Sequence, residues 1–263
     1  MRIGLVLGLV GMALMGGSWA QGTPSITGYV KTPNIAPGFA LPEMQKLSDD
    51  VYVAQLSPML WVHTTVGVLD DGSKYAANGM LLEDGAGSIL FDAGWNADEA
   101  VTLMDWAANI LKHPVVKAYV THSHNDRTGG MRALEQRAIP VYGTALTAEL
   151  AAKAKNPVPD HVMPVPTESV SVAADALILF PGAGHTHDNL VVYFPKEHSL
   201  YGGCFLKASN ADGLGNTADA DVKAWPASVK KMQAAFPMES RVVPGHGPMD
   251  GDAVGRTLEL LKR

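Results

Sequence analysis

Short runs of aliphatic and β-branched residues, separated by turn-forming residues, dominate the first part of the chain that has a regular pattern. Such runs cover residues 51–55, 60–68, 78–83 and 88–92. Their length and composition are typical of β-strands, and their close succession predicts an antiparallel meander. Residues 69–74 read Leu-Asp-Asp-Gly-Ser-Lys, which is the composition of an exposed hairpin tip.

Helical periodicity begins after this meander. Asn96 can cap a helix together with Glu99, and Val101, Met104 and Leu111 continue at helical spacing. Further strands are predicted at residues 115–120, near 141, and at 176–180, 190–194, 199–203 and 241–243, and further helices from about 131 and at 146–155, 227–236 and 253–262. Because strands lead and helices follow in both halves, the pattern indicates sheets that helices cover in layers.

The first 20 residues have the layout of a secretory signal peptide. Arg2 supplies a basic start, residues 3–15 are apolar, and Ser18 and Ala20 fit a small-residue cleavage site. The apolar block is shorter than the roughly 18 residues that a membrane span needs, so it is interpreted as a signal peptide that is cleaved after Ala20. The alternative is that the segment is retained as a membrane anchor. We therefore expect an exported protein.

The segment that follows the leader, residues 21–44, contains four prolines and has no helical or alternating period. This composition predicts an extended lead-in and not a domain. One domain is then expected over residues 45–263, which is a length that a single α/β domain often reaches.

The net charge limits which binding partners are expected, and the single cysteine limits the chemistry of its thiol. The formal net charge is −6, which argues against nucleic acid or an anionic membrane surface as a partner. We expect a monomer that acts on small molecules. The single cysteine, Cys204, cannot form an internal disulfide, so in an exported chain its thiol is either buried and inert or bound to metal.

The most informative run is residues 121–130, Thr-His-Ser-His-Asn-Asp-Arg-Thr-Gly-Gly. His122, His124 and Asp126 alternate with small or polar residues directly after an apolar strand. Side chains at this spacing on a turn can converge on one metal ion without a helix to hold them. Zinc requires such convergence, since its ligands lie about 2.0–2.2 Å from the ion.

Three more metal-capable side chains follow predicted strands and lie beside glycines, which allow sharp turns: His185, Cys204 and His246. The six candidates divide into two zinc sites. His122, His124 and His185 form a three-imidazole site with a fourth position open for water, and Asp126, Cys204 and His246 form a mixed site. Two metals of this kind can share one hydroxide.

These residues occur in motifs whose order and spacing resemble those of the class B metallo-β-lactamases. The motifs are His122-x-His124-x-Asp126-Arg127, Gly184-His185-Thr186-x-Asp188-Asn189, Gly202-Gly203-Cys204-x-x-Lys207, Leu214-Gly215-Asn216 and Pro244-Gly245-His246. The resemblance covers about residues 50–263 and is to subclass B1. Arg127 and Cys204 distinguish this resemblance from one to the wider superfamily, because glyoxalase-like relatives usually carry a histidine at the first of these positions and a bridging aspartate at the second.

The resemblance implies a fold and a reaction. The fold is a four-layer αββα sandwich with the site at one edge between two sheets. The reaction is hydrolysis of penicillins, cephalosporins and carbapenems in the periplasm by a hydroxide held between two Zn²⁺ per chain, which confers antibiotic resistance. Asp126 is expected to be both a ligand and a catalytic group. Asn216 would stabilise the oxyanion, and Lys207, as an exposed loop lysine, would pair with the substrate carboxylate.

Supporting residues are implied by the same resemblance. Arg127 would fix the ligand loop. Asp92 would brace that loop from behind, the alternative being a strand-end acid in water. His187 is expected at the pocket rim and not as a ligand, whereas the role of Asp188 stays open.

The segment 66–75 corresponds to the flap over the substrate in the resembled family. Its tip carries acidic residues and Lys74, with no exposed large apolar residue expected except Tyr75.

Two other functions remain open from the residues. One is a zinc hydrolase of another ester, thioester or lactone, against which Cys204, Lys207 and the leader argue. The other is a non-catalytic zinc-binding exported protein, which would bind zinc without turnover.

Overall fold

The computed structural model describes residues 43–237 and 240–263. The signal peptide at 1–20 and nearly all of the lead-in at 21–44 lie outside the described residues. Within them the chain alternates strands and helices in the order that the hydrophobic pattern predicts.

The first half of the chain forms a large mixed sheet. Within the described part, this sheet contains eight strands in sequence order: β1 (Gln45–Lys46), β2 (Val51–Gln55), β3 (Leu60–Val68), β4 (Lys74–Asp84), β5 (Gly87–Phe91), β6 (Val115–Tyr119), β7 (Val141–Thr144) and β8 (His161–Met163). Neighbours from β1 to β5 are antiparallel, as the predicted meander requires. From β5 to β8 they are parallel.

The second half forms a smaller sheet, ordered β13-β12-β11-β10-β9. Its described strands are β9 (Val170–Ala173), β10 (Ala176–Leu179), β11 (Val191–Phe194), β12 (Ser199–Gly203) and β13 (Arg241–Pro244). β12 and β13 are parallel, whereas the other pairs are antiparallel.

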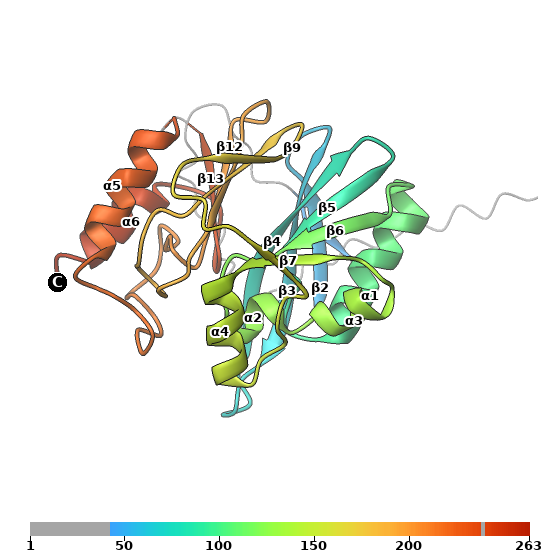
Figure 1. Cartoon of the computed structure of the whole chain (residues 1–263), viewed down its shortest axis with the longest axis horizontal. Helices are drawn as coiled ribbons and strands as arrows, with labels where there is room; N and C mark the ends of the chain where they lie inside the picture. The colour runs from blue at the N-terminus through green and yellow to red at the C-terminus, as the bar shows by residue number, and fades with distance from the viewer. Residues whose placement is uncertain (1–42, 238–239) are drawn as a thin grey trace, which may run out of the picture.

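Helices cover the outer faces of both sheets (Figure 1). α1 (Ala97–Trp106), which a π-helical turn (Ala107–Leu111) extends, and α3 (Met131–Gln136) pack on the first sheet. α5 (Trp225–Ala235) and α6 (Ala253–Leu260) pack on the second sheet. The two remaining described helices are α2 (Asn125–Thr128) and α4 (Ala145–Ala154). The predicted four-layer αββα sandwich is confirmed.

Alternating side chains on each strand explain why both faces of each sheet are buried. On β4, Met80 and Leu82 belong to the core between the sheets, while Leu81 packs under the helices of the first layer. On β11, Val192 faces the central core and Val191 faces α5. Successive residues of a strand point to opposite faces, so a sheet that is covered on both sides needs continuous apolar runs.

Several predicted boundaries were wrong. β4 begins at Lys74 and not at residue 78, since the flap hairpin pairs down to its tip, where Val68 lies opposite Lys74. β8 and β9 were not predicted, because short edge strands with exposed residues show little alternation. The run 121–130 was expected to lack a helix, yet α2 forms one helical turn within it and carries Asp126.

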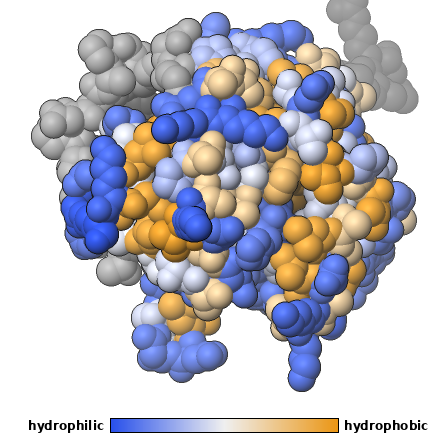
Figure 2. Space-filling model, turned by 60° about the vertical axis from the view of Figure 1, so that its left-hand side comes forward, coloured by the Kyte–Doolittle hydropathy of each residue, from blue (hydrophilic) through white to orange (hydrophobic). Residues whose placement is uncertain are grey.

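The outer surface combines apolar and polar areas. On the face shown in Figure 2, hydrophobic residues form several patches that hydrophilic residues separate. Among the described residues, no helix has both the length and the apolar character needed to cross a membrane.

His63 lies on β3 and is 2% exposed. A Cβ at Gly79 would lie 2.2 Å from its Nε2 atom, so the ring fits directly against the glycine backbone of β4. The Nε2 atom is 3.3 Å from the Phe91 carbonyl oxygen, and Nδ1 has no hydrogen-bond partner among the described residues. Burial lowers the pKa of His63 to about 4.

This lowered pKa predicts acid sensitivity. Because the pKa of the unfolded histidine is about 6.5, the contribution of His63 to stability is complete above that pH and is lost as the pH falls towards 4. We predict that His63→Gln reduces the pH-dependent loss of unfolding free energy by up to about 3 kcal/mol. Urea unfolding of both proteins between pH 7 and 4 measures this.

The exposed His187 supplies a matched control. His187→Gln, at an exposed position, controls for the removal of a histidine that is not buried. Equal slopes for wild type and His63→Gln would contradict the prediction.

Candidate metal centre

Four strands end near one edge of the sandwich, where the two sheets face each other. β6 of the first sheet ends just before His122, while β10, β12 and β13 of the second sheet end before His185, Cys204 and His246. The predicted ligands therefore come together from both sheets, although they are spread over 125 positions of the sequence from His122 to His246.

The three-histidine group consists of His122, His124 and His185, whose ligand nitrogens lie within 4.8 Å of one another. His185 Nε2 is 3.2 Å from His124 Nδ1. His122 Nε2 is buried and has no hydrogen-bond partner in the described part of the chain. Burial is the main cause that lowers the pKa of His185 to about 2 and that of His122 well below its usual range. Neutral imidazoles with converging lone pairs are the form that binds a metal ion.

The mixed group consists of Asp126, Cys204 and His246. His246 Nε2 lies 3.1 Å from Cys204 Sγ and 3.2 Å from Asp126 Oδ2, and the last two atoms are 3.5 Å apart. A Cβ at position 245 would lie 2.8 Å from the Cys204 sulfur, so this close approach requires Gly245. His122 also lies within 4.8 Å of Asp126 and Cys204, which means that the two groups adjoin.

The charges of the mixed group favour a cation. Burial opposes protonation of His246, but Cys204 and the hydrogen bond to Asp126 raise its pKa to about 9. Burial alone would raise the pKa of Asp126, because it disfavours the charged carboxylate, yet Arg127 and His246 hold this pKa well below its usual range. Carboxylate, sulfur and imidazole donors in a buried anionic site suit zinc, so the residues fit this metal.

Arg127 is fully buried beneath the mixed group and joins the two sheets. Its Nη2 donates to Cys204 Sγ at 2.9 Å and forms an ion pair with Asp126 at 2.7 Å. Its Nη1 donates to the Asn78 carbonyl on β4 and to the Tyr201 hydroxyl on β12. The guanidinium thus orients ligands on one side and holds both sheets on the other.

Asp92 lies behind the ligand loop and is 1% exposed, so the alternative of a solvated strand-end acid was wrong. It accepts hydrogen bonds from the Thr121 N–H at 2.7 Å, from the Thr121 hydroxyl at 2.8 Å and from the Tyr201 hydroxyl at 2.6 Å. Thr121 directly precedes His122. Burial raises the pKa of Asp92, and Arg127, 3.5 Å away, opposes that shift.

Asp219 contacts the three-histidine group and was missed by the sequence reasoning. Its Oδ2 lies 2.9 Å from His124 Nε2, opposite the nitrogen that faces His185. A carboxylate on the outer nitrogen of a ligand histidine fixes its tautomer and orientation. The sequence carries no signal for this contact, since Asp219 is one of several acids in an irregular loop.

Lys207 and Asn216 lie in the loop segment that follows β12. The expectation that Lys207 is exposed was wrong: its ammonium lies 5.4 Å from the centre of the Trp225 ring, and burial lowers its pKa. Its charge contributes to the low pKa of His185, which indicates that it faces the centre. Asn216 is exposed, and its Oδ1 accepts the Ala218 N–H at 3.0 Å.

An aromatic wall beside the mixed group was also missed. The Tyr75 ring lies 4.6 Å from the His246 ring and 6.4 Å from that of Trp95. A Cβ at Gly67 would lie 2.3 Å from the Trp95 ring, so the indole packs on the base of the flap. The flap is also less polar than expected, because Val68 is 66% and Leu69 is 39% exposed.

Two polar residues next to His185 differ in their surroundings. His187 is exposed, outside the three-histidine group. Asp188 is 1% exposed, and the hydroxyls of Thr186 and Thr147 lie beside its carboxylate. Burial raises its pKa. Asp188 is therefore not a plain solvent-exposed turn residue.

Known proteins share these features over most of the chain. Residues 73–246 match the metallo-beta-lactamase superfamily. The metallo-beta-lactamase type 2 of Bacteroides fragilis is 34% identical over 222 residues, covering 83% of this chain and 88% of the relative. That of Bacillus cereus is 36% identical over 213 residues, with coverages of 81% and 83%.

Solved structures agree with the fold. The metallo-beta-lactamase of Erythrobacter litoralis superposes with a TM-score of 0.79 at 33% identity, over 83% of this chain and 99% of that one. The metallo-beta-lactamase FIM-1 of Pseudomonas aeruginosa in its mono-zinc form gives 0.78 at 32% identity, over 82% and 98%. With its sandwich fold and its converging histidine, aspartate and cysteine side chains, this chain belongs to the metallo-β-lactamase superfamily.

Proposed function

We propose that this chain is a periplasmic zinc-dependent hydrolase of β-lactam antibiotics, which acts on penicillins, cephalosporins and carbapenems and confers resistance to them. The observation that carries the proposal is the convergence of two adjoining ligand groups, one of three histidines and one of mixed donors. The names of the similar proteins support the same reaction.

We propose two Zn²⁺ per chain. His122, His124 and His185 would hold one ion, and Asp126, Cys204 and His246 would hold the other. When bound, zinc supplies a nucleophile at neutral pH by lowering the pKa of water and polarises the carbonyl group under attack.

The chain's own residues bind and orient the substrate. The Lys207 ammonium, close enough to the centre to act on the pKa of His185, would pair with the substrate carboxylate. The Asn216 amide would donate to the oxyanion, because its Oδ1 already accepts the Ala218 N–H and its Nδ2 has no bond within the described structure. Asp126, whose pKa is held low, keeps its charge throughout.

Positions behind the ligands keep these atoms in place. Arg127 would hold Asp126 and Cys204, Asp92 would brace the backbone that precedes His122, and Asp219 would orient His124. The signal-peptide-like composition of residues 1–20 supports a periplasmic location. We further propose that the enzyme acts as a monomer, without nucleic acid or membrane partners.

Hydrolysis of one penicillin, one cephalosporin and one carbapenem by the purified mature chain tests the proposal. We expect turnover of all three, with two zinc ions counted per chain, loss of activity after chelation and recovery with added zinc. A lactone and a thioester serve as competing substrates. Turnover of these alone would favour the rival hydrolase, and zinc binding without any turnover would favour a non-catalytic protein.

A substitution in the mixed group tests the ligand assignment. Cys204→Ser removes the sulfur that lies 3.1 Å from His246 Nε2. We expect it to lose one zinc per chain and to reduce activity by roughly 10- to 100-fold at low zinc, a typical cost of perturbing a metal site. Metal analysis beside the kinetic assay measures both effects. Full activity of this variant at low zinc would refute the assigned ligands.

Removal of the Asp92 carboxylate tests whether this residue holds the backbone that precedes His122. Asp92→Ala leaves the Thr121 N–H without its acceptor, removes one of the two acceptors of the Tyr201 hydroxyl and leaves part of the Arg127 charge unpaired. Loss of one partner of a buried ion pair costs about 3–5 kcal/mol, so we predict a large drop in unfolding free energy and weaker zinc binding. Denaturant unfolding and zinc titration check both.

The exposed pair of Asp105 and Arg137 offers the matched control, with an Nη1–Oδ1 distance of 2.6 Å. Asp105→Ala should change stability by less than about 1 kcal/mol, because solvent screens exposed pairs. If the two variants lost equal stability, the proposed role of Asp92 would be wrong.

A further inference from the structure

The loop segment 207–211 lies directly on the C-terminal part of the chain. The Lys207 N–H donates to the Thr257 hydroxyl of α6 at 2.8 Å. A Cβ at Gly251 would lie 2.8 Å from the Cβ of Ser209, so side chain and backbone are in close contact there. This segment connects Cys204 to Asn216, the ligand and the amide donor proposed above.

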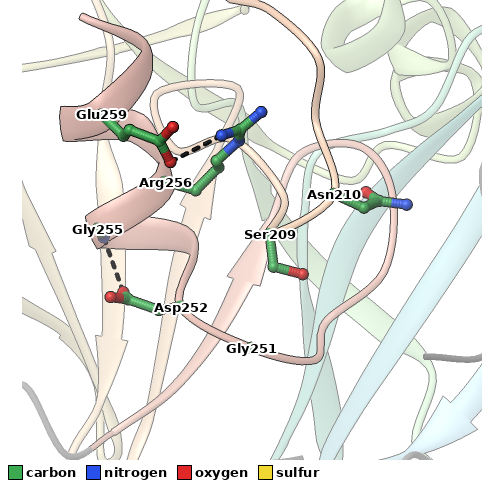
Figure 3. A pocket seen from close by; sticks show the side chains of 7 residues that line it. All are labelled: Ser209, Asn210, Gly251, Asp252, Gly255, Arg256 and Glu259. Carbon is green, nitrogen blue, oxygen red and sulfur yellow. Dashed lines mark hydrogen bonds and ion pairs between the residues drawn. The ribbon is translucent and has the colours of Figure 1, made fainter. Parts of the chain in front are cut away.

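Arg256 makes the last contact of this series. Its Nε and Nη2 atoms both donate to the Ala211 carbonyl oxygen, at 2.8 and 2.5 Å. Its Nη1 pairs with Glu259 one turn later on α6 at 2.7 Å. Figure 3 shows the guanidinium reaching from α6 towards the loop that carries Ser209 and Asn210.

A cavity lies beside this contact. Its volume is about 620 Å³, and its lining includes Ser209, Asn210, Gly251 and Arg256. Tight packing holds a loop in place through many small contacts, and on the side of the pocket Ser209 and Asn210 lack such contacts. The two hydrogen bonds from Arg256 to Ala211, the next residue, are the restraint that the loop has beside this pocket.

Ala211 lies four residues after Lys207 and five before Asn216. Its own N–H donates to the Ala208 carbonyl at 2.9 Å, which makes residues 208–211 a turn. The turn links Ala211 directly to Ala208, the residue after Lys207, and Ala211 leads along the same loop to Asn216.

We propose that Arg256 is a positioning residue for substrate binding: by holding the Ala211 carbonyl it fixes the loop that presents Lys207 and Asn216. This inference rests on the substrate-binding roles proposed for those two residues. Arg256 itself touches none of the six ligand side chains by any hydrogen bond of the described structure. Its effect should consequently fall on KM and leave zinc binding intact.

Arg256→Met in the zinc-loaded enzyme is the decisive variant, because methionine keeps the apolar stem and removes every donor. Loss of a hydrogen bond to a charged group corresponds to about a tenfold effect. We expect KM for a carbapenem to rise by about that factor, with kcat within about twofold and the zinc count unchanged. Arg256→Lys, which keeps one donor, should recover part of the loss.

Glu259→Gln is the matched control. It weakens the exposed ion pair on the same side chain but leaves the Ala211 contact. Its KM should equal that of wild type. An equal rise in KM for Glu259→Gln and Arg256→Met would overturn the inference.

Amide hydrogen exchange gives a readout independent of turnover. Arg256→Met should speed exchange across residues 208–218 by at least about tenfold, since local opening becomes easier. Unchanged exchange or unchanged KM would each overturn the inference. If Arg256→Met leaves KM unchanged, Lys207→Ala shows which proposal is wrong. An unchanged KM for Lys207→Ala would contradict the proposed substrate-binding role of the loop itself. A raised KM for Lys207→Ala would contradict only the positioning role of Arg256.

Discussion

The guanidinium of Arg127 is the interaction on which the rest of the centre depends. It is fully buried, and its partners come from both sheets and from the mixed group of Asp126, Cys204 and His246. A buried cation is tolerated only where acceptors surround it, and removal of one partner leaves an uncompensated charge. The geometry of the mixed group and the contact between the sheets at this edge are therefore parts of one electrostatic network.

This network makes the two ligand groups unlike in charge. In the three-histidine group, burial lowers the pKa values of His122 and His185 and keeps both rings neutral, and the charge of Lys207 adds to this effect at His185. The mixed group is anionic enough to keep the pKa of His246 near 9. If each group holds a zinc ion, as proposed, a neutral group beside an anionic one would give two metal positions of different affinity and different Lewis acidity, because ligand charge is donated to the ion. Such asymmetry suits a reaction in which a carbonyl oxygen and a leaving nitrogen need different stabilisation.

The sequence predicts the ligands better than their supports. His122, Cys204 and His246 could be found because each follows an apolar strand, and glycine beside a strand end marks a close approach of backbone. The layers could be found because strands covered on both faces need continuous apolar runs. Asp219 and Arg256 could not, since their contacts join loops to distant elements and leave no periodic trace. The exposure of Lys207 was misjudged for the same reason: Trp225, whose ring its ammonium contacts, lies on α5, distant in the sequence from the loop that carries Lys207.

The supports that the sequence hides share one property, which is that they act on loops and not on strands. Asp219 contacts the outer nitrogen of His124 from the loop before α5, and α6 holds the segment after β12 through Thr257 and Arg256. The strands that precede the candidate ligands are held by sheet hydrogen bonds, on both sides for β6, β10 and β12 and on one side for β13, and Asp92 and Arg127 add further restraint. A loop has no such ladder and takes its position from single side-chain contacts. The candidate metal ligands consequently depend on strands and on the contacts of Asp92 and Arg127, whereas the residues proposed to meet the substrate lie on a loop that takes its position from single contacts with α6.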